Sequence, residues 1–295
     1  MSITTIPRRA FGTTGASVSI IGLGGGGAGH NPQIQGTPDK PHTVALAEQI
    51  IHRALDMGVN LFDTCSGYGA SEQILGHVAA DRRSEMFLAT KNGIPHASGD
   101  QVRRELDQSL TRLQTDYVDL VQIHNLQTLE QAELIFAKDH AIEVYLKARE
   151  EGLTRFIGIT SHNRYQPLIA VLDRCAHEGI KMDSVLTGFN IADMAYGGHG
   201  KRLLNRYPAV AKMAMTLFGC DGAPIMKQTG YTAKTLIRYV LSHPFATAVI
   251  GMHTIRELEE NLAIAQEFVS YTDAELRDIE TSVDPAKVGG GFVLT

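Results

Sequence analysis

The chain has 295 residues, of which 43% are hydrophobic, and a formal net charge of −5. Because the sequence has no long run of like charge, it lacks the electrostatic surface that nucleic acids and anionic membranes select, and its apolar stretches are too short to span a bilayer. The three cysteines, Cys65, Cys175 and Cys220, are few and scattered, which is typical of reduced thiols in a cytoplasmic protein.

The N-terminal stretch RRAFGTTGASVS, residues 8–19, places the turn residues Gly12 and Gly15 between two strand-like pieces and predicts a β-hairpin. Its first residues, Arg8 and Arg9, precede an apolar run and also resemble a twin-arginine export signal. That run is short, is broken by glycines and has no small-residue cleavage pattern after it. We therefore expect a cytoplasmic protein.

The glycine run GLGGGG that follows matches a dinucleotide-binding fingerprint through Gly22, Gly24 and Gly27. A Rossmann domain would need a helix directly after the glycines and an acidic residue about 20 positions later. The glycines lead instead into HNPQIQGTPDKPH, whose three prolines disfavour a helix. The run alone therefore leaves open whether it binds a dinucleotide.

Short apolar segments then alternate with amphipathic ones along the chain. The predicted strands are residues 18–24, 60–65, 86–91, 118–124, 154–160, 184–189, 223–227 and 247–251. The predicted helices are residues 43–58, 71–82, 100–113, 128–152, 232–243, 254–268 and 272–283. Eight strands with intervening helices in roughly 250 residues predict an α/β fold, a (β/α)8 TIM barrel with an N-terminal β-hairpin; an open doubly wound sheet is the alternative. We expect a single domain over residues 1–295, with residues 284–295 as a flexible tail or a segment that closes the pocket.

Three successive predicted strands end in titratable residues. The second ends in Asp63, with Tyr68 five residues later, the third in Lys91 and the fourth in His124. Each residue alone has an ordinary structural interpretation, such as a turn cap or a solvated side chain. Together, at the strand ends where barrels carry their chemistry, they favour a catalytic group.

The chemistry of this group suits proton delivery to a carbonyl oxygen. A tyrosine hydroxyl has a pKa of about 10, and a nearby ammonium lowers it by favouring the phenolate. A carboxylate keeps that ammonium charged, and an imidazole can orient a carbonyl. Since no side chain can donate a hydride, the arrangement implies a nicotinamide cofactor.

At these residues the sequence resembles the aldo-keto reductase family. The resemblance includes FDTCSGYGASEQILG, FLATKNG, DYVDLVQIHN, GLTRFIGITSHN, MKQTGY and VIGMHTIRELEENL, in that order, and the SHN triplet resembles one bacterial branch. It implies that Tyr68 is the general acid/base, that Lys91 and Asp63 tune it, and that His124 orients the substrate. It also places the glycine run at the mouth of the active site, where its backbone can approach the cofactor or substrate closely.

The resemblance implies further cofactor contacts. They are Gly24 and Gly25 in the glycine run, Thr160, Ser161 and Asn190 near the nicotinamide, Lys227, Gln228 and Thr229 in a phosphate loop, and Gly251, His253, Arg256, Glu260 and Asn261 around the adenosine. Leu186 stands where many members have a glutamine, and Arg256 is the only strong cation near the expected 2′-phosphate. NADP is the implied cofactor, with NAD as the alternative.

We therefore expect an NAD(P)H-dependent enzyme that reduces an aldehyde or ketone, with sugar-like carbonyls among the candidates, or catalyses the reverse oxidation. The alternatives are a nicotinamide-binding regulatory subunit and an enzyme that uses the same residues for non-reductive chemistry. The expected partner is a small carbonyl or alcohol substrate, whose determinants would lie in residues 25–42, 125–130, 190–222 and the tail. His30, His162 and His199 could touch substrate but lack metal-ligand spacing, so we expect no metal. We interpret Cys65 as a small buried hydrophobic residue.

Overall fold

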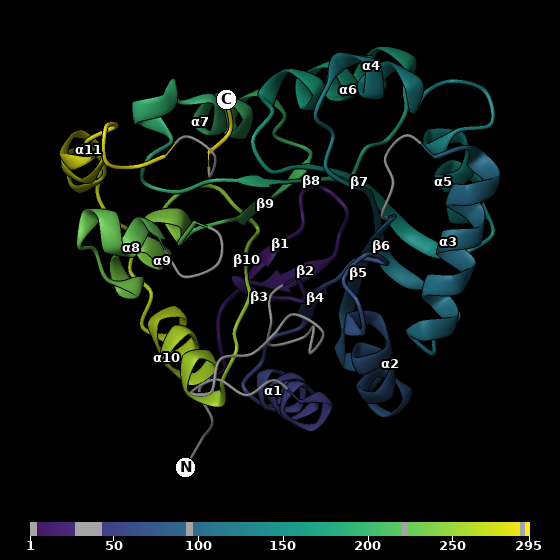
Figure 1. The fold of residues 1–295 in the computed structure, drawn as a ribbon, viewed down its shortest axis with the longest axis horizontal. Coiled ribbons are helices and arrows are strands. Elements are labelled where there is room, and N and C mark those ends of the chain that lie inside the picture. The colour runs from purple at the N-terminus through teal and green to yellow at the C-terminus, as the bar shows by residue number, and fades with distance from the viewer. Residues whose placement is uncertain (1–4, 27–42, 93–96, 220–223, 290–292) are drawn as a thin grey trace.

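The computed structural model describes residues 5–26, 43–92, 97–219, 224–289 and 293–295. Eight parallel strands close into a barrel in the order β10-β3-β4-β5-β6-β7-β8-β9, and helices surround them (Figure 1). The strands are β3 (Ile21–Gly24), β4 (Leu61–Asp63), β5 (Phe87–Asn92), β6 (Val118–Ile123), β7 (Thr154–Ser161), β8 (Ser184–Gly188), β9 (Ala211–Met215) and β10 (Thr247–Ile250). The predicted TIM barrel is confirmed, and the open sheet is excluded.

Side chains at the helix starts explain where many of the helices begin. Thr43, Thr254 and Thr272 each accept a hydrogen bond from a backbone N–H in the first turn of the following helix. The described helices are α1 (Val44–Asp56), α2 (Ser71–Arg82), α3 (Gly99–Arg112), α4 (Leu129–Leu134), α5 (Ala141–Glu150), α6 (Tyr165–Glu178), α7 (His199–Arg206), α8 (Pro224–Thr229), α9 (Ala233–Leu241), α10 (Ile255–Gln266) and α11 (Asp273–Ser282), with short 3-10 helices at Arg83–Glu85 and Met194–Tyr196. Within the described ranges, none of them combines the length and apolarity that a membrane crossing requires.

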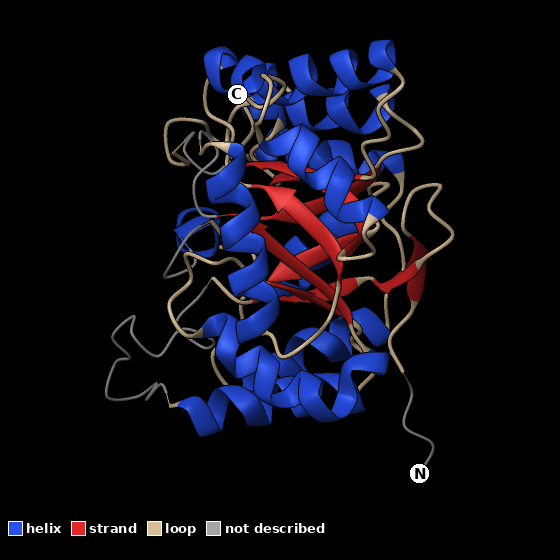
Figure 2. Cartoon of the chain, turned by 90° about the vertical axis from the view of Figure 1, so that its right-hand side faces the viewer, coloured by secondary structure: helices blue, strands red, loops and turns tan. Residues whose placement is uncertain are grey.

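The predicted N-terminal hairpin is confirmed. Strands β1 (Arg8–Ala10) and β2 (Ser17–Ser19) pair antiparallel and lie at one end of the barrel (Figure 2). Phe11, in the hairpin loop, is fully buried, and its ring lies 4.8 Å from that of Phe87 and 6.1 Å from that of Phe156. Because Phe87 and Phe156 stand at the starts of β5 and β7, the hairpin closes the N-terminal end of the barrel.

The predicted seventh strand is wrong. Residues 223–227 were expected to form it, but the strand is β9, and Pro224–Thr229 forms α8. Proline is favoured at the first position of a helix, where its missing N–H costs nothing. The true strand was obscured by Lys212, a buried lysine in an otherwise apolar segment. Residues 190–222, where substrate determinants are expected, therefore include α7 and β9, and Met215 and Thr216 from this range line the cavity described below.

Two other predicted boundaries differ from the structure. The single helix expected over residues 128–152 is divided into α4 and α5, and Asp139 in the connection has a positive φ of 59° that a continuous helix does not permit. The strand expected over residues 18–24 is divided between β2 in the hairpin and β3 in the barrel. Both differences leave the barrel order unchanged.

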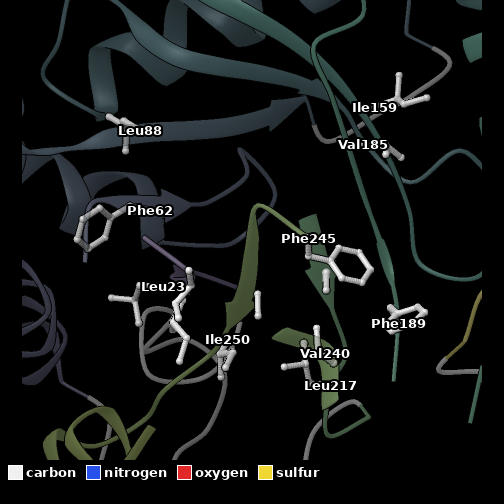
Figure 3. Packing of buried hydrophobic residues seen from close by; sticks show 14 of the residues in the cluster. Leu23, Phe62, Leu88, Ile159, Val185, Phe189, Leu217, Val240, Phe245 and Ile250 are labelled. Carbon is white, nitrogen blue, oxygen red and sulfur yellow. The ribbon is translucent and has the colours of Figure 1, made fainter. Parts of the chain in front are cut away.

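The two-residue period of the strands sorts their side chains into two clusters. One cluster packs between the strands and the surrounding helices, and Figure 3 shows part of it, including Phe62, Leu88 and Val185. The alternate residues form the second cluster, in which Leu61, Ala89 and Leu120 fill the barrel interior. The same alternation points the residues two and four positions further along these strands inward, toward the C-terminal mouth.

Candidate active site

Polar residues from three adjacent strands meet at the C-terminal end of the barrel interior. Lys91 Nζ donates hydrogen bonds to Asp63 Oδ2 at 2.5 Å and to the Thr64 carbonyl oxygen at 2.7 Å. Gln122 Nε2 donates to the other carboxylate oxygen of Asp63 at 2.8 Å. Lys91 is only 2% exposed, so this is a buried ion pair whose carboxylate is held on both oxygens.

Tyr68 lies on the turn after β4, beside this ion pair. Lys91 Nζ is 5.1 Å from the centre of the Tyr68 ring, and the His124 ring meets the tyrosine edge-on, with centroids 5.8 Å apart. These residues line one cavity with Gly24, Gly26, Asp63, Thr160, His162, Leu186, Met215, Thr216, Val249 and Gly251. The structure thus brings together the four residues that the sequence singled out for chemistry, Asp63, Tyr68, Lys91 and His124, which we call the tetrad.

The charges of the ion pair and the tyrosine are set by burial and by their neighbours. Burial acts to lower the pKa of Lys91, but the combined effect of Asp63, Tyr68 and Cys65 outweighs it and leaves the pKa above its ordinary value. Burial raises the pKa of Tyr68, and the opposing effect of Lys91 does not cancel it. Lys91 lowers the pKa of Tyr68, as expected, but the net shift is upward and not downward as the sequence predicts. The tyrosine keeps its proton at neutral pH and can donate it.

His124 is held as a neutral imidazole. Burial, followed by the positive charge of Lys91 and the neighbouring His162, lowers the pKa of His124 to about 3. Its backbone N–H donates to Asn92 Oδ1 at 3.2 Å. A neutral ring that lines the cavity can donate one hydrogen bond to a ligand without bringing in a second positive charge.

The glycine run makes room for the tyrosine and for helix α2. A Cβ atom on Gly26 would lie 3.0 Å from Tyr68 Cε2, and one on Gly25 would lie 2.3 Å from Ser71 Oγ. Either contact would force the neighbouring group to move. The run ends strand β3 of a barrel, so it is not part of a Rossmann fold, and Gly27, the third glycine of the fingerprint, lies outside the described residues.

The residues expected near the nicotinamide are largely occupied by backbone contacts. Thr160 Oγ1 accepts from the N–H of Asn125 at 2.7 Å, and Ser161 Oγ donates to the Leu126 carbonyl oxygen at 2.7 Å. Asn190 Nδ2 donates to the Thr216 carbonyl oxygen, and its Oδ1 accepts from Ala192. Thr160 lines the cavity, whereas Ser161 and Asn190 are not among its lining residues.

Apart from Gly251, the residues expected at the phosphates and the adenosine are not among those that line the cavity. Lys227 and Gln228 are exposed on α8, and Thr229 Oγ1 donates to a carbonyl within the same helix. On α10, Arg256 is 86% exposed and pairs with Glu260 at 2.7 Å. Gly251 lines the cavity. The His253 N–H donates to Glu257 at 2.7 Å, and Asn261 is buried.

Several cavity or site residues were given no firm role from the sequence, among them Cys65, His162, Leu186 and Met215. His162, Leu186 and Met215 follow the same inward alternation as the tetrad, so strand period alone could have placed them at the mouth. Ser161 falls on the outward parity, which explains its backbone bonding. Cys65 contacts His124, at 3.3 Å between Sγ and Nδ1.

The described end of the tail packs against the mouth of the barrel. Val293 and Leu294 are buried, and the Thr295 N–H donates to the Asn163 carbonyl oxygen at 3.0 Å. Tyr196 donates to the Pro285 carbonyl oxygen at 3.0 Å. These contacts favour a packed tail over a free one. In the described part of the chain, no cluster of three or more His, Cys, Asp or Glu side chains could hold a metal ion.

Comparison with known proteins bears directly on this site. The model of the Aldo/keto reductase family matches residues 21–197. The chain is 29% identical to L-galactose dehydrogenase of Arabidopsis thaliana, over 97% of each protein. It is 33% identical to 6-dehydroglucose reductase of Novosphingobium aromaticivorans, over 54% of this chain and 52% of that protein.

Solved structures give the same fold. An aldo-keto reductase from Bacillus halodurans in its holo form superposes with a TM-score of 0.72 at 22% identity, covering 95% of this chain and 97% of that one. The family match covers more than half of the chain and includes Asp63, Tyr68, Lys91 and His124. The chain therefore belongs to the aldo/keto reductase family.

Proposed function

We propose that this protein is an NADP(H)-dependent enzyme that reduces the carbonyl group of an aldehyde or ketone, or catalyses the reverse oxidation, with Tyr68 as the general acid/base. The observation that carries the proposal is the buried Lys91–Asp63 pair beside Tyr68 and His124 in one cavity. The names of two relatives, L-galactose dehydrogenase and 6-dehydroglucose reductase, support a sugar-like substrate.

The cavity has features that fit a nicotinamide ring. Gly24 and Gly251 line it without side chains, and Met215 and Val249 add apolar surface beside the tyrosine. A flat ring needs such a slot, with the reacting carbonyl held between it and the acid. When bound, the nicotinamide would supply the hydride, which no side chain of the protein can provide.

The protein's own residues would handle the proton. The substrate carbonyl oxygen accepts hydrogen bonds from the Tyr68 hydroxyl and the neutral His124 ring. As the carbonyl carbon is reduced, its oxygen gains negative charge and takes the proton from Tyr68. The phenolate that remains is stabilised by Lys91, whose ammonium lies near the ring and is kept charged by Asp63. In the oxidation, the same groups act in reverse.

The preference for NADP(H) over NAD(H) rests on Arg256 and His253, near the expected 2′-phosphate. One observation favours NAD(H) as a second candidate. Arg256 is paired with Glu260, and the Glu257 carboxylate accepts a hydrogen bond from the His253 N–H at the start of α10. These carboxylates offset the positive charge that would attract a 2′-phosphate.

The test is fluorescence titration with NADPH and NADH, followed by carbonyl reduction assays on a panel of aldoses and small aldehydes. Both are done on the wild type and on Tyr68→Phe. We expect the variant to bind cofactor as the wild type does and to reduce carbonyls about 10²–10⁴-fold more slowly, because it lacks only the acid. Absence of binding for both cofactors would refute the redox assignment. Tight binding without turnover on any substrate would favour the regulatory subunit.

A further inference from the structure

Cys65 lies beside the tetrad, in the segment that follows β4. The thiol is buried, and its Sγ lies 3.3 Å from His124 Nδ1. The N–H of Gly67 donates to the same sulfur at 3.4 Å. Neither contact is one that a purely hydrophobic residue would make.

The chemistry of the two groups favours a thiol–imidazole hydrogen bond in which the thiol is the donor. A cysteine sulfur is a weak acceptor with one hydrogen to donate. While the sulfur accepts from the Gly67 N–H, its hydrogen is still available to donate, and an unprotonated imidazole nitrogen is a stronger acceptor than a thiol sulfur. Burial raises the pKa of Cys65 to about 11, so the thiol keeps that hydrogen at neutral pH. The sulfur then donates, and Nδ1 accepts.

The rest of His124 is held from its backbone. Its N–H donates to Asn92 Oδ1 at 3.2 Å, and the N–H of the following residue, Asn125, donates to Thr160 Oγ1 at 2.7 Å. Asn125 also adopts a positive φ of 52°, which sets the path of the loop after the histidine. These contacts fix the position of Cα but leave the ring nitrogens to the side-chain partner, Cys65.

We infer that Cys65 is a positioning residue, whose thiol holds His124 in the tautomer that carries its proton on Nε2 and so lets the ring donate to the substrate's carbonyl oxygen. The inference rests on the proposed carbonyl reduction. In the opposite tautomer, Nδ1 would donate to sulfur, and Nε2 would present a lone pair to a carbonyl oxygen, which repels it. The thiol thus selects the useful form of a ring that stays neutral.

The first experiment reads the tautomer directly and needs no turnover. Long-range ¹H–¹⁵N spectra of protein labelled with ¹⁵N-histidine distinguish the two neutral tautomers, and His124→Gln identifies the His124 signal by its loss. We expect the wild type and Cys65→Ser to show the proton on Nε2. Cys65→Ala removes the donor, so we expect its His124 signal to move to an average of the two tautomers.

The second experiment measures turnover of the same variants. We expect kcat for carbonyl reduction to fall about three- to tenfold in Cys65→Ala, which corresponds to the loss of one weak hydrogen bond. Cys65→Ser should stay within about threefold of the wild type, since its hydroxyl also donates. The dissociation constant for NADPH should be unchanged in both, because the thiol contacts His124 and not the cofactor side of the cavity.

Cys175→Ala is the matched control. Cys175 is also buried, but it lies on α6 and is not among the residues that line the cavity. Its loss should leave both the tautomer and kcat unchanged. An Nδ1-protonated His124 in the wild type would overturn the inference, as would an alanine variant that keeps the wild-type tautomer. A serine variant as slow as the alanine variant would show that the sulfur acts by packing.

If the wild type reduces no carbonyl, the proposed function fails, while the spectra still decide whether Cys65 sets the tautomer. If the wild type is active and the spectra do not change with Cys65, the inference alone fails. The two results are therefore separable.

Discussion

Each end of the barrel buries a carboxylate in an ion pair, but the two carboxylates have different partners and different surroundings. At the N-terminal end, Asp119 accepts from Arg83 at 2.9 Å, from Arg155 at 2.6 Å and from the Leu88 N–H at 2.9 Å. At the C-terminal end, Asp63 accepts from Lys91 and from an uncharged amide, that of Gln122. One carboxylate is shared by two arginines, whereas the other depends on a single lysine.

What lies above each carboxylate differs as well. The hairpin and the Phe11 ring cover the N-terminal end, so its ion pairs act in packing and closure. At the C-terminal end, Tyr68 and His124 stand beside the ion pair and line a cavity. The comparison teaches that two buried ion pairs of one barrel differ in their surroundings, since only the one at the C-terminal end has titratable neighbours that line a cavity and could serve the proposed chemistry.

The largest expected effect comes from removing the cation at the C-terminal end. Lys91→Met leaves Asp63 buried without a charge partner, so we expect the free energy of unfolding to fall by about 3–5 kcal/mol. Carbonyl reduction should also fall about 10²–10⁴-fold, because the tyrosine loses the charge that stabilises its phenolate. Urea denaturation and steady-state kinetics measure the two effects.

Arg83→Met is the counterpart at the other end. Asp119 keeps Arg155 and the Leu88 N–H, so the loss of stability should be smaller, about 1–2 kcal/mol, and turnover should stay near the wild-type value. Equal losses of turnover in both variants would break the distinction between a closing end and a reactive end.

A buried lysine at the N-terminal end gives the next effect. Lys212 has no carboxylate partner among the described residues, and its ammonium donates to the Tyr207 carbonyl oxygen. Burial lowers its pKa from 10.5 to about 8. The unfolded chain therefore binds this proton more tightly, so the free energy of unfolding rises with pH between about 8 and 10.5, and the full cost of the charge is present below pH 8.

Replacing that lysine should stabilise the protein. We expect Lys212→Met to raise the free energy of unfolding at pH 7 by about 1–2 kcal/mol, after allowing for the lost hydrogen bond to Tyr207. The advantage should shrink as the pH approaches 10.5. Urea denaturation at pH 7, 8, 9 and 10 checks this, and a difference that stays constant with pH would show that Lys212 is not the titrating group. Turnover should not change, since Lys212 is remote from the cavity.

The smallest expected effect concerns the exposed residues of α10 that are proposed to contact the cofactor. Arg256 is solvent-exposed and already paired, so Arg256→Ala should weaken NADPH binding by only about two- to fivefold and leave NADH binding unchanged. Glu260→Gln releases the guanidinium and should tighten NADPH binding by a similar factor. Fluorescence titration measures both. A loss of NADH binding in Arg256→Ala would mean that the arginine acts by packing rather than by charge.

The sequence by itself determined the barrel and the tetrad. The alternation of strands and helices is visible in the sequence, and the two-residue period within a strand sets which side chains point into the barrel, independently of the loops. Asp63, Lys91 and His124 sit on that inward period at three successive strand ends, so local pattern was enough to bring them together. The capping threonines and the hairpin turn are also local, which is why those elements were predicted correctly.

Only the tertiary structure decided the rest. The seventh strand contains Lys212, whose burial depends on neighbours distant in sequence, so hydrophobic pattern assigned the strand to Pro224–Thr229 instead. The net rise in the pKa of Tyr68 comes from burial, and no spacing along the chain reports it. The contact between Cys65 and His124 joins residues 59 positions apart. Such long-range contacts exist only once the barrel has closed, because closure alone sets which strand ends face one another.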